Sequence, residues 1–552
     1  MQTEPFTEFP SSKPAIHVPN WALILLFIAY ALPANVGHAP WRGDDALHIG
    51  VAYSMLQDGT WLTPQIGGQP FVDWPPLTYW LGALSGVLLG WLFALHDAIR
   101  LANVAMLALM IGFLRYAARD LYGRESASAA AMLALGSLGL LLHAHEMQPQ
   151  MTSAAALSGV LYGLVQLRAP GRRGVLVTGA ATAATFLAAG LPGLAVSLPL
   201  WLVLPATDAG CRTRAFFLRL LQAGVLALTL VLLWPALLAW QDPAYLNAWW
   251  NSEYNAVIPH GGHFVRGNDF ANLVSWFTWP LWPVVLWSLW YRRGRIQAFG
   301  HAIPLAAAVL ALLIALGTGS MRPANLVPLL PPLILMAAGE LCRLRRGAAN
   351  AFDWFGVITF SLLGLALWLA WVAMNFGWPE PLSRNILRIL PGFEPDWTWY
   401  QLVIALVLSV GWIIALVKLP FFQLRGAVHW ALGITLTWGL ATTLCFAWFD
   451  YNKNYAPVSS AIARAVAREA LGGCVAGMDV GDSQRAALLY FDQLRIAPTA
   501  ADCSLRLAYA TGQNALPPAP ADWQTVWQLE RGSGRLGERF ALYRSPSAAP
   551  RD

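Results

Sequence analysis

Long apolar segments alternate with short polar connections over most of the chain. Each segment approaches the roughly 20 residues that a helix needs to cross the hydrocarbon core of a bilayer. The pattern therefore predicts an all-α polytopic membrane protein. Fourteen segments qualify: 20–37, 78–95, 101–117, 127–142, 151–167, 174–188, 191–205, 216–237, 274–290, 300–318, 324–340, 353–375, 399–417 and 427–447.

A different pattern follows the last apolar segment. Short stretches of helical and strand periodicity alternate there, and a Gly-Ser-Gly turn between two strands indicates a hairpin. Residues 449–552 are therefore predicted to form a small α/β domain after a membrane domain of residues 20–448 and an N-terminal segment of residues 1–19. The expected elements are helices over Ser459–Ala470 and Ser483–Phe491, a strand over Cys474–Val480, and a hairpin of Thr525–Leu529 with Arg539–Tyr543.

Composition agrees with the membrane interpretation. Hydrophobic residues make up 57% of the chain and charged residues only 12%, which excludes an ordinary soluble protein. The net charge of +6 is not accompanied by a nucleic-acid-binding motif. Cys474 and Cys503 are the two cysteines of the tail, where a disulfide between them is expected if the tail lies outside the cytoplasm. The other three cysteines are expected to pack as small apolar side chains: Cys211, Cys342 and Cys445.

Arginine-rich clusters between the apolar segments predict the topology. Lys and Arg favour the cytoplasmic side of a membrane, and all the clusters share that side only if one early segment does not cross. Segment 78–95 follows Pro75-Pro76 and contains glycines, so we expect a re-entrant or membrane-surface helix there. Thirteen crossings then leave the N-terminus in the cytoplasm and residues 450–552 outside. The clusters are Arg115/Arg119/Arg124, Arg168/Arg172/Arg173, Arg212/Arg214/Arg219, Arg292/Arg293/Arg295, Arg343/Arg345/Arg346 and Lys418/Arg425.

The first outer loop, residues 38–77, is unusually rich in acidic residues for a position beside a membrane. A short amphipathic helix is expected from Asp44 to Leu56, with the Asp44-Asp45 pair at its N-terminus, where negative charge is favoured. A carboxylate there can accept a proton from an attacking hydroxyl or phosphate while its neighbour holds the helix start. The alternative interpretation is that both residues only cap the helix. We name Asp44 and Asp45 as the candidate catalytic pair.

A third acid of this loop, Asp73, suggests a second kind of site. Together with His263 or His260 it could bind zinc or a similar divalent ion, because carboxylate and imidazole both suit such metals. The alternative is that these are solvated loop residues. No metal-finger spacing of cysteines is present.

Cations are scarce on the predicted outer side, which makes three of them notable. Arg266, Arg322 and Lys453 could hold the phosphate of a lipid carrier, and attraction to lipid headgroups is the alternative. A further polar cluster contains His143, His145 and Glu146. It could make a second polar contact at the mouth of the site, or simply end a helix at the membrane interface.

The loop also resembles a known family. Its sequence resembles the first periplasmic loop of bacterial membrane glycosyltransferases of the GT-C fold, in particular the aminoarabinose transferases that modify lipid A and the protein O-mannosyltransferase-like enzymes. The resemblance extends over most of the chain and includes FLAAGLPGL at 186–194. The matching positions are Asp44-Asp45, Tyr53, Met55, Gly59, Trp61, Pro64, Gly67-Gly68, Phe71, Asp73, Pro75-Pro76 and Tyr79-Trp80.

The resemblance implies a reaction and its participants. It implies an inverting transferase in the bacterial inner membrane that takes a sugar from a polyprenyl phosphate, typically undecaprenyl phosphate, and passes it to lipid A or another glycolipid on the periplasmic side. Asp44 corresponds to the catalytic position. Asp73 corresponds to a metal-associated acid, with His263 or His260 as its partner. Tyr79, a matching position, and Trp74, which stands next to Pro75-Pro76, are assigned to donor binding. The other residues with this assignment are Arg266, Arg322 and Lys453.

Three positions depart from the family pattern. Trp74 stands where relatives carry Lys, Gln150 stands where they carry Asp, and Ala189 replaces the Lys of a Lys-Gly pair. Glu146 lies about one helical turn before Gln150, so the two are assigned together to acceptor or second polar contacts. A non-catalytic scaffold that binds lipid-linked sugars, or a transporter, is the alternative function. The near absence of charges inside the apolar segments favours transfer at the outer face over transport.

Overall fold

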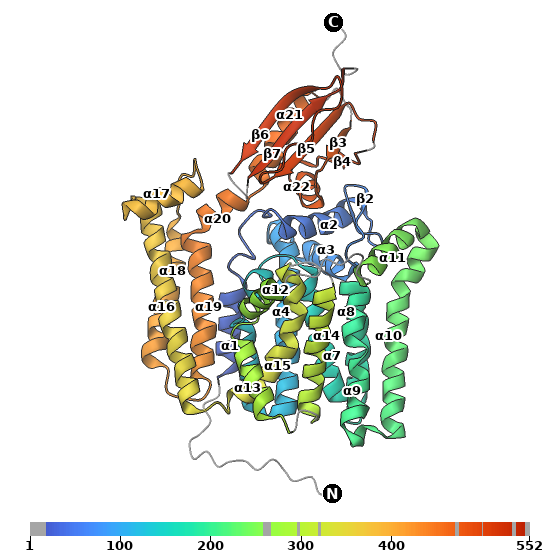
Figure 1. The fold of residues 1–552 in the computed structure, drawn as a ribbon, viewed down its shortest axis with the longest axis vertical. Coiled ribbons are helices and arrows are strands. Elements are labelled where there is room, and N and C mark those ends of the chain that lie inside the picture. Colours follow the sequence, from blue (N-terminus) through green and yellow to red (C-terminus); the bar gives the residue numbers. More distant parts are fainter. Residues whose placement is uncertain are drawn as a thin grey trace.

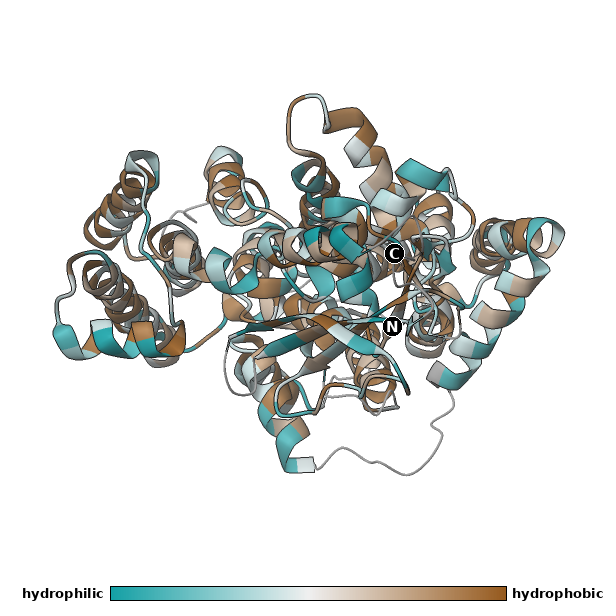
Figure 2. Ribbon diagram, turned by 90° about the horizontal axis from the view of Figure 1, so that it is seen from above, coloured by the Kyte–Doolittle hydropathy of each residue, from teal (hydrophilic) through white to brown (hydrophobic). Residues whose placement is uncertain are grey.

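The computed structural model describes residues 18–257, 267–294, 298–317, 322–469, 474–499, 501–532 and 537–546. Long helices stand side by side in a bundle, and the C-terminal segment lies above one end of it (Figure 1). Seen from above, the bundle helices appear end-on and mostly in the hydrophobic colour (Figure 2). The mainly helical membrane fold predicted from the sequence is therefore confirmed.

The bundle helices run roughly parallel to one another (Figure 1). They are α1 (Asn20–Ala31), α4 (Leu95–Tyr122), α5 (Arg124–Leu135), α7 (Pro149–Leu167), α8 (Arg172–Ser197), α9 (Leu200–Thr207), α10 (Arg214–Gln241), α13 (Leu281–Tyr291), α14 (Phe299–Gly317), α15 (Leu330–Leu341), α16 (Arg346–Phe376), α18 (Trp399–Lys418) and α19 (Arg425–Leu444). Two 3₁₀ helices, η1 (Ala209–Cys211) and η2 (Pro323–Leu329), join members of the bundle.

Within the described residues, seven helical segments are long and apolar enough to cross a membrane, or eight if the bent pair α19 and α20 (Phe446–Lys453) is one span. Three shorter apolar helices accompany them, and one of these is α3 (Leu77–Leu89). Its 13 residues extend only about 20 Å, less than the roughly 30 Å of hydrocarbon. This length fits the expected membrane-surface helix at 78–95, whereas the total of thirteen crossings stays a prediction.

One of the seven candidates, Arg172–Thr207, folds back on itself at Gly190. This glycine has φ 60°, outside the helical region, and the Oγ atoms of Thr185 and Ser197 lie 2.9 Å apart. Twelve residues of straight helix would separate those two side chains by about 18 Å. The segment is therefore two antiparallel arms, as the separate apolar stretches 174–188 and 191–205 predict.

Basic residues from several predicted clusters meet at the end of the bundle opposite the C-terminal segment. Arg168 forms an ion pair with Asp208 at 2.8 Å, which holds the two ends of the folded-back segment together. Arg292 and Arg343 approach the buried Glu340 at 2.9 and 3.6 Å. The clustering on one side that the topology prediction required is thus present for these residues.

Short helices lie at the other end of the bundle, between it and the C-terminal segment or at its edges (Figure 1). They are α2 (Asp44–Asp58), α3, α6 (Leu140–His143), α11 (Pro243–Val257), α12 (Gly267–Phe277), α17 (Glu380–Ile389) and α20. The first outer loop also contains a small hairpin of β1 (Gln65–Ile66) and β2 (Gln69–Pro70), whose Gly67-Gly68 turn has positive φ at both glycines.

Helix α2 is more deeply buried than expected for an amphipathic surface helix. Side chains around most of its circumference are buried, because α2 lies between α3 and α22 (Asp482–Asp492) of the C-terminal segment. Gly50 permits this approach, since a Cβ there would lie 2.5 Å from the Cβ of Ala486. The C-terminal segment therefore covers the helix that carries the candidate catalytic acids.

The C-terminal segment contains a mixed five-stranded sheet with the strand order β4-β3-β5-β7-β6. Strand β3 pairs in parallel with β4 and β5, and β7 pairs antiparallel with β5 and β6. Its elements are α21 (Ala456–Glu469), β3 (Val475–Met478), α22, β4 (Ile496–Ala497), β5 (Leu505–Thr511), β6 (Gln524–Arg531) and β7 (Glu538–Arg544).

The expected α/β composition of this segment is confirmed. Both helices, the first strand and the hairpin occur within a few residues of their predicted positions, and Cys474 forms the expected disulfide with Cys503. The sequence prediction missed β5, the central strand, and the short β4. Cys211 and Cys445 are buried as expected, and Cys342 is partly buried.

Candidate active site

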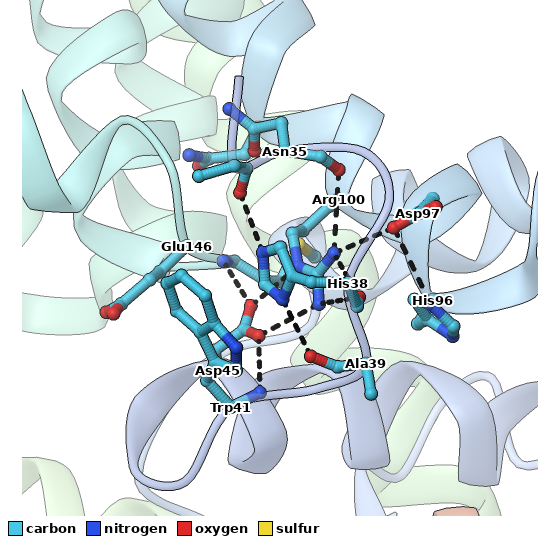
Figure 3. A network of polar contacts seen from close by, with 12 residues as sticks. Asn35, His38, Ala39, Trp41, Asp45, His96, Asp97, Arg100 and Glu146 are labelled. Carbon is cyan, nitrogen blue, oxygen red and sulfur yellow. Dashed lines mark hydrogen bonds and ion pairs between the residues drawn. The ribbon is translucent and has the colours of Figure 1, made fainter. Parts of the chain in front are cut away.

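The N-terminus of α2 is fixed by a buried network of polar side chains around Arg100, whose side chain is completely buried (Figure 3). Its guanidinium contacts both oxygens of Asp45 at 3.0 Å and one oxygen of Asp97 at 2.9 Å. It also donates to the backbone carbonyl of His38. Such a bidentate pair has the geometry in which Arg binds a carboxylate most strongly.

Asp45 has no free acceptor position for a substrate. Besides Arg100 it accepts hydrogen bonds from the backbone N–H groups of Trp41 and Met147. Burial by itself would raise the pKa of Asp45, but the charge and hydrogen bonds of Arg100 outweigh that effect and lower the pKa below its usual value. Asp45 is placed to hold the helix start rather than to accept a proton.

Asp44 occupies the next position and has a different environment. Its side chain is half-buried, and no hydrogen bond or ion pair to it occurs within the described part of the chain. Its charge acts on His48, on Tyr79 and on Glu146. His48 Nδ1 lies 2.9 Å from the hydroxyl of Tyr79, and burial lowers the pKa of His48 to about 4. A neutral imidazole therefore adjoins a carboxylate without a partner.

Two of the predicted polar contacts form a pair beside Asp44. Lys453 lies 3.5 Å from Glu146 and 4.8 Å above the ring centroid of Trp41. Burial raises the pKa of Glu146 to about 7, and the charge of Lys453 offsets part of the rise. This pair brings a cation from α20 to the side of α2 that carries the candidate base.

A cavity of about 190 Å³ is lined in part by residues further along the first outer loop, and its described lining contains no residue of α2. Its lining includes the predicted residues Asp73, Trp74 and Gln150, together with Ala189 at the tip of the folded-back segment. Burial and the nearby Asp482 raise the pKa of Asp73, while Arg322 partly offsets the rise. Arg322 also acts on His48, so its charge is felt both by Asp73 and by a neighbour of Asp44.

Glu253 also lines this cavity, and it was not predicted from the sequence. It belongs to α11, is 5% exposed, and accepts a hydrogen bond of 2.8 Å from the backbone N–H of Leu191. That N–H begins the second arm of the folded-back segment, where a helix N-terminus favours negative charge. Gly190 leaves the necessary space, because a Cβ there would collide with the carboxyl group of Glu253. Burial raises the pKa of Glu253 to about 7.

Most of the predicted site residues are thus brought together, although they come from distant parts of the sequence. Asp44, Asp45, Asp73, Trp74, Tyr79, Glu146, Gln150, Arg322 and Lys453 all lie around α2 or the cavity. Arg266, His260 and His263 lie outside the described residues. Asp97 and Arg100 were missed, because they fall between the predicted apolar segments 78–95 and 101–117, whereas in the structure they belong to the first turns of α4.

The predicted metal set is represented among the described residues by Asp73 alone. In that part of the chain no group of three or more His, Cys, Asp and Glu side chains could hold a metal ion. One carboxylate supplies too few donors for a zinc-type site. We therefore assign no chemical step to a metal.

Proteins with an assigned activity match much of this chain. A protein of Edwardsiella ictaluri, named undecaprenyl phosphate-alpha-4-amino-4-deoxy-L-arabinose arabinosyl transferase, is 27% identical over 380 residues, which are 64% of this chain and 66% of that protein. The chain thus spans slightly less than two thirds of that relative. A protein of the same name from Pseudomonas savastanoi pv. phaseolicola is 26% identical over 456 residues, or 78% of this chain and 79% of that protein. No family model matches the chain.

Solved structures match nearly the whole chain. The crystal structure of ArnT from Cupriavidus metallidurans in the apo state has a TM-score of 0.66 and 19% sequence identity, and the match covers 97% of this chain and 100% of that one. The structure of the same protein bound to undecaprenyl phosphate also has a TM-score of 0.66, with 18% identity. The chain therefore has the fold of these structures, and the predicted GT-C fold is confirmed.

Proposed function

We propose that this chain, whose resemblance to the aminoarabinose transferases is confirmed by sequence and by fold, is a membrane glycosyltransferase. It moves a sugar from undecaprenyl phosphate to a lipid acceptor such as lipid A. The observation that carries this proposal is the position of Asp44. Its carboxylate is half-buried and without a partner in the described part of the chain. The charges of Asp44 and Arg322 both act on His48, and those of Asp44 and Lys453 both act on Glu146.

These residues suit a single displacement at the anomeric carbon. Asp44 accepts the proton of the acceptor oxygen as that oxygen forms a bond to the anomeric carbon. The bond from that carbon to the phosphate oxygen breaks, which inverts the configuration and releases undecaprenyl phosphate. Arg322 and Lys453, with Arg266 as a third candidate, stabilise the negative charge on the departing phosphate.

The orientation in the membrane follows from the same assignment. Basic residues gather at the end of the bundle opposite α2, and Lys and Arg favour the cytoplasmic side. We therefore place α2, residues 38–77 and the C-terminal domain of residues 449–552 in the periplasm, and residues 1–19 in the cytoplasm. The disulfide between Cys474 and Cys503 fits this placement, because the periplasm is oxidising.

The cavity that Asp73 lines suits an amino sugar as the transferred group. It is lined by the carboxyl groups of Asp73 and Glu253, and its described lining includes no Lys or Arg. The replacements at Trp74 and Ala189 remove the two lysines that the family pattern would place there. A sugar ammonium would pair with these carboxylates through charge-assisted hydrogen bonds, and the names of the two relatives include a 4-amino-4-deoxy sugar.

This assignment predicts a pH dependence of donor binding. The pKa of Glu253 is raised to about 7, so the carboxylate form increases between pH 6 and 7.5, while an amine with a pKa of about 8 stays mostly protonated. The KM for an amino-sugar donor is therefore expected to fall about fivefold over this range. Glu253→Gln should give a flat KM profile, and the exposed Glu380→Gln should behave like the wild type. An unchanged profile in Glu253→Gln would show that this carboxyl group does not contact the amine.

A reaction with purified components tests the proposed function itself. The detergent-solubilised protein is incubated with an undecaprenyl-phosphate amino sugar and lipid A, without ATP or an ion gradient. We expect mass spectrometry to find glycosylated lipid A and free undecaprenyl phosphate in equal amounts. A donor that is bound but never consumed would favour the alternative function, a scaffold or transporter for lipid-linked sugars. The departures from the family pattern at Trp74, Gln150 and Ala189 are the observation that favours this alternative.

A further inference from the structure

A second and larger cavity is lined in part by α20, the helix that also carries Lys453. Its volume is about 790 Å³, and it is bounded by the segment joining α17 to α18, by α20 and α21, and by the end of β6. We call it the α20 groove. Asp450 and Tyr451 of α20 line the groove, while Lys453 of the same helix pairs with Glu146 on the active-site side. One short helix therefore contributes residues to both sites.

Aromatic rings form part of the groove and remain open to solvent. Trp397, Tyr400 and Tyr451 are 45%, 51% and 48% exposed and all line the cavity. An aromatic belt at a membrane interface would face lipid, whereas these rings face a cavity that also contains carboxyl, amide and guanidinium groups. Rings of this kind offer an apolar face and a polar edge to one ligand.

The charges in the groove are predominantly negative. Four carboxylates line it, and Arg531 is the single cation in its described lining. Arg531 is itself occupied, because one terminal nitrogen donates to the backbone carbonyls of Tyr451 and Asn452. A phosphorylated or sulfated ligand would therefore be repelled, and a cationic one attracted. The carboxylates are Glu394, Asp396, Asp450 and Glu530.

The walls of the groove are held in place by contacts that need no ligand. The ring of Trp397 packs edge-on against Trp371 with the centroids 5.9 Å apart, and the hydroxyl of Tyr451 donates to the carbonyl of Pro391 at 3.3 Å. Asp450 accepts a hydrogen bond of 3.1 Å from Trp41 Nε1, which ties the groove to the start of the active-site loop. A preformed site loses less conformational entropy on binding.

We propose that the α20 groove is a second saccharide-binding site, which takes an amino sugar without phosphate groups. The C–H face of a sugar ring packs on Trp397 or Tyr400, hydroxyl groups bond to the carboxylates and to Asn454 or Gln401, and the ammonium group lies among the acids. A cation near the aromatic faces adds a further attraction. This site does not depend on the transfer reaction, and the sugar it binds belongs to a glycan next to the acceptor.

Binding of a soluble glucosamine tetrasaccharide to the full-length protein in detergent tests the proposal. Titration calorimetry should give saturable binding that is at least about tenfold tighter than binding of the N-acetylated tetrasaccharide, which has no ammonium groups. Trp397→Ala should weaken binding about tenfold. Trp399→Ala is the matched control, because Trp399 is two residues away, 74% exposed and not among the groove-lining residues, so it should bind like the wild type.

Two further variants locate the bound sugar. Asp396→Asn combined with Glu394→Gln should weaken binding of the glucosamine form and leave the N-acetylated form unchanged, whereas Asp44→Asn should change neither. Loss of binding in Asp44→Asn would place the sugar in the active site and overturn the proposal. Three other results would also overturn the proposal: no binding of the glucosamine form to the wild-type protein, unchanged affinity in Trp397→Ala, or tighter binding of a phosphorylated saccharide. None of these results depends on whether the protein transfers a sugar, so the two proposals fail separately.

Discussion

Replacing Asp44 with asparagine is expected to abolish sugar transfer, with a loss of about 10²- to 10⁴-fold, the range attributed to a positioned general base. Asparagine keeps the size of the side chain but cannot accept the proton from the acceptor oxygen. Because no hydrogen bond or ion pair to Asp44 occurs in the described part of the chain, the variant should keep the wild-type melting temperature. Transfer is measured by mass spectrometry of lipid A with a synthetic undecaprenyl-phosphate sugar.

The neighbouring residue provides the contrast for this experiment. Asp45→Asn should lower the melting temperature, because it removes one charge from a buried pair with Arg100. If Asp44→Asn still transferred sugar at a rate near that of the wild type, the assignment of the base would be wrong. Asp44→Glu, which keeps the carboxylate but moves it by one methylene group, should retain more activity than Asp44→Asn.

Replacing Arg100 with alanine is expected to destabilise the folded protein by about 3–5 kcal/mol, the usual cost of removing one partner from a buried ion pair. The guanidinium contacts Asp45 and Asp97, and its side chain is completely buried. Without it, two carboxylates remain in a low-dielectric environment, and the backbone carbonyl of His38 loses its donor. The thermal unfolding midpoint and the yield of folded protein measure the effect.

Arg384→Ala is the control for this substitution. Arg384 pairs with Glu380 on α17, and both side chains are more than 70% exposed. Exposed pairs of this kind contribute about 0–1 kcal/mol, so the midpoint should hardly change. The unfolding midpoint of Arg100→Lys should lie between those of Arg100→Ala and Arg384→Ala. Lysine keeps the charge but cannot contact both oxygens of Asp45 in the same geometry. A midpoint for Arg100→Ala equal to that of the wild type would show that the network does not hold the start of α2.

Much of the site was predictable because its residues stand out against an apolar chain. Four acids in one loop beside a membrane need an explanation, and the turns that interrupt this loop indicate a folded structure. The same contrast identified Arg322, Glu146 and Lys453. The structure places these three around α2, and it also contains the helix that the sequence predicted from Asp44 onward.

Other residues could not be assigned from the sequence. Asp44 and Asp45 are identical and adjacent, so only their surroundings distinguish them: one carboxylate is bound by Arg100, and the other is left without a partner in the described part of the chain. Glu253 gave no signal, because its role depends on the backbone N–H of Leu191, 62 residues away. The α20 groove was not predictable either, because residues before α18, residues after α19 and the end of β6 form it together.

By itself, the sequence determined the helical membrane fold, the α/β character of the C-terminal segment, the disulfide and the acid-rich loop that contains α2. These features depend on local periodicity and composition, which the chain records residue by residue. Only the tertiary structure decided which acid has no partner among the described residues, which is buried in an ion pair, and which groups line the cavity. Burial and charge pairing depend on residues that are distant in sequence, and they set the protonation and the accessibility of each carboxyl group.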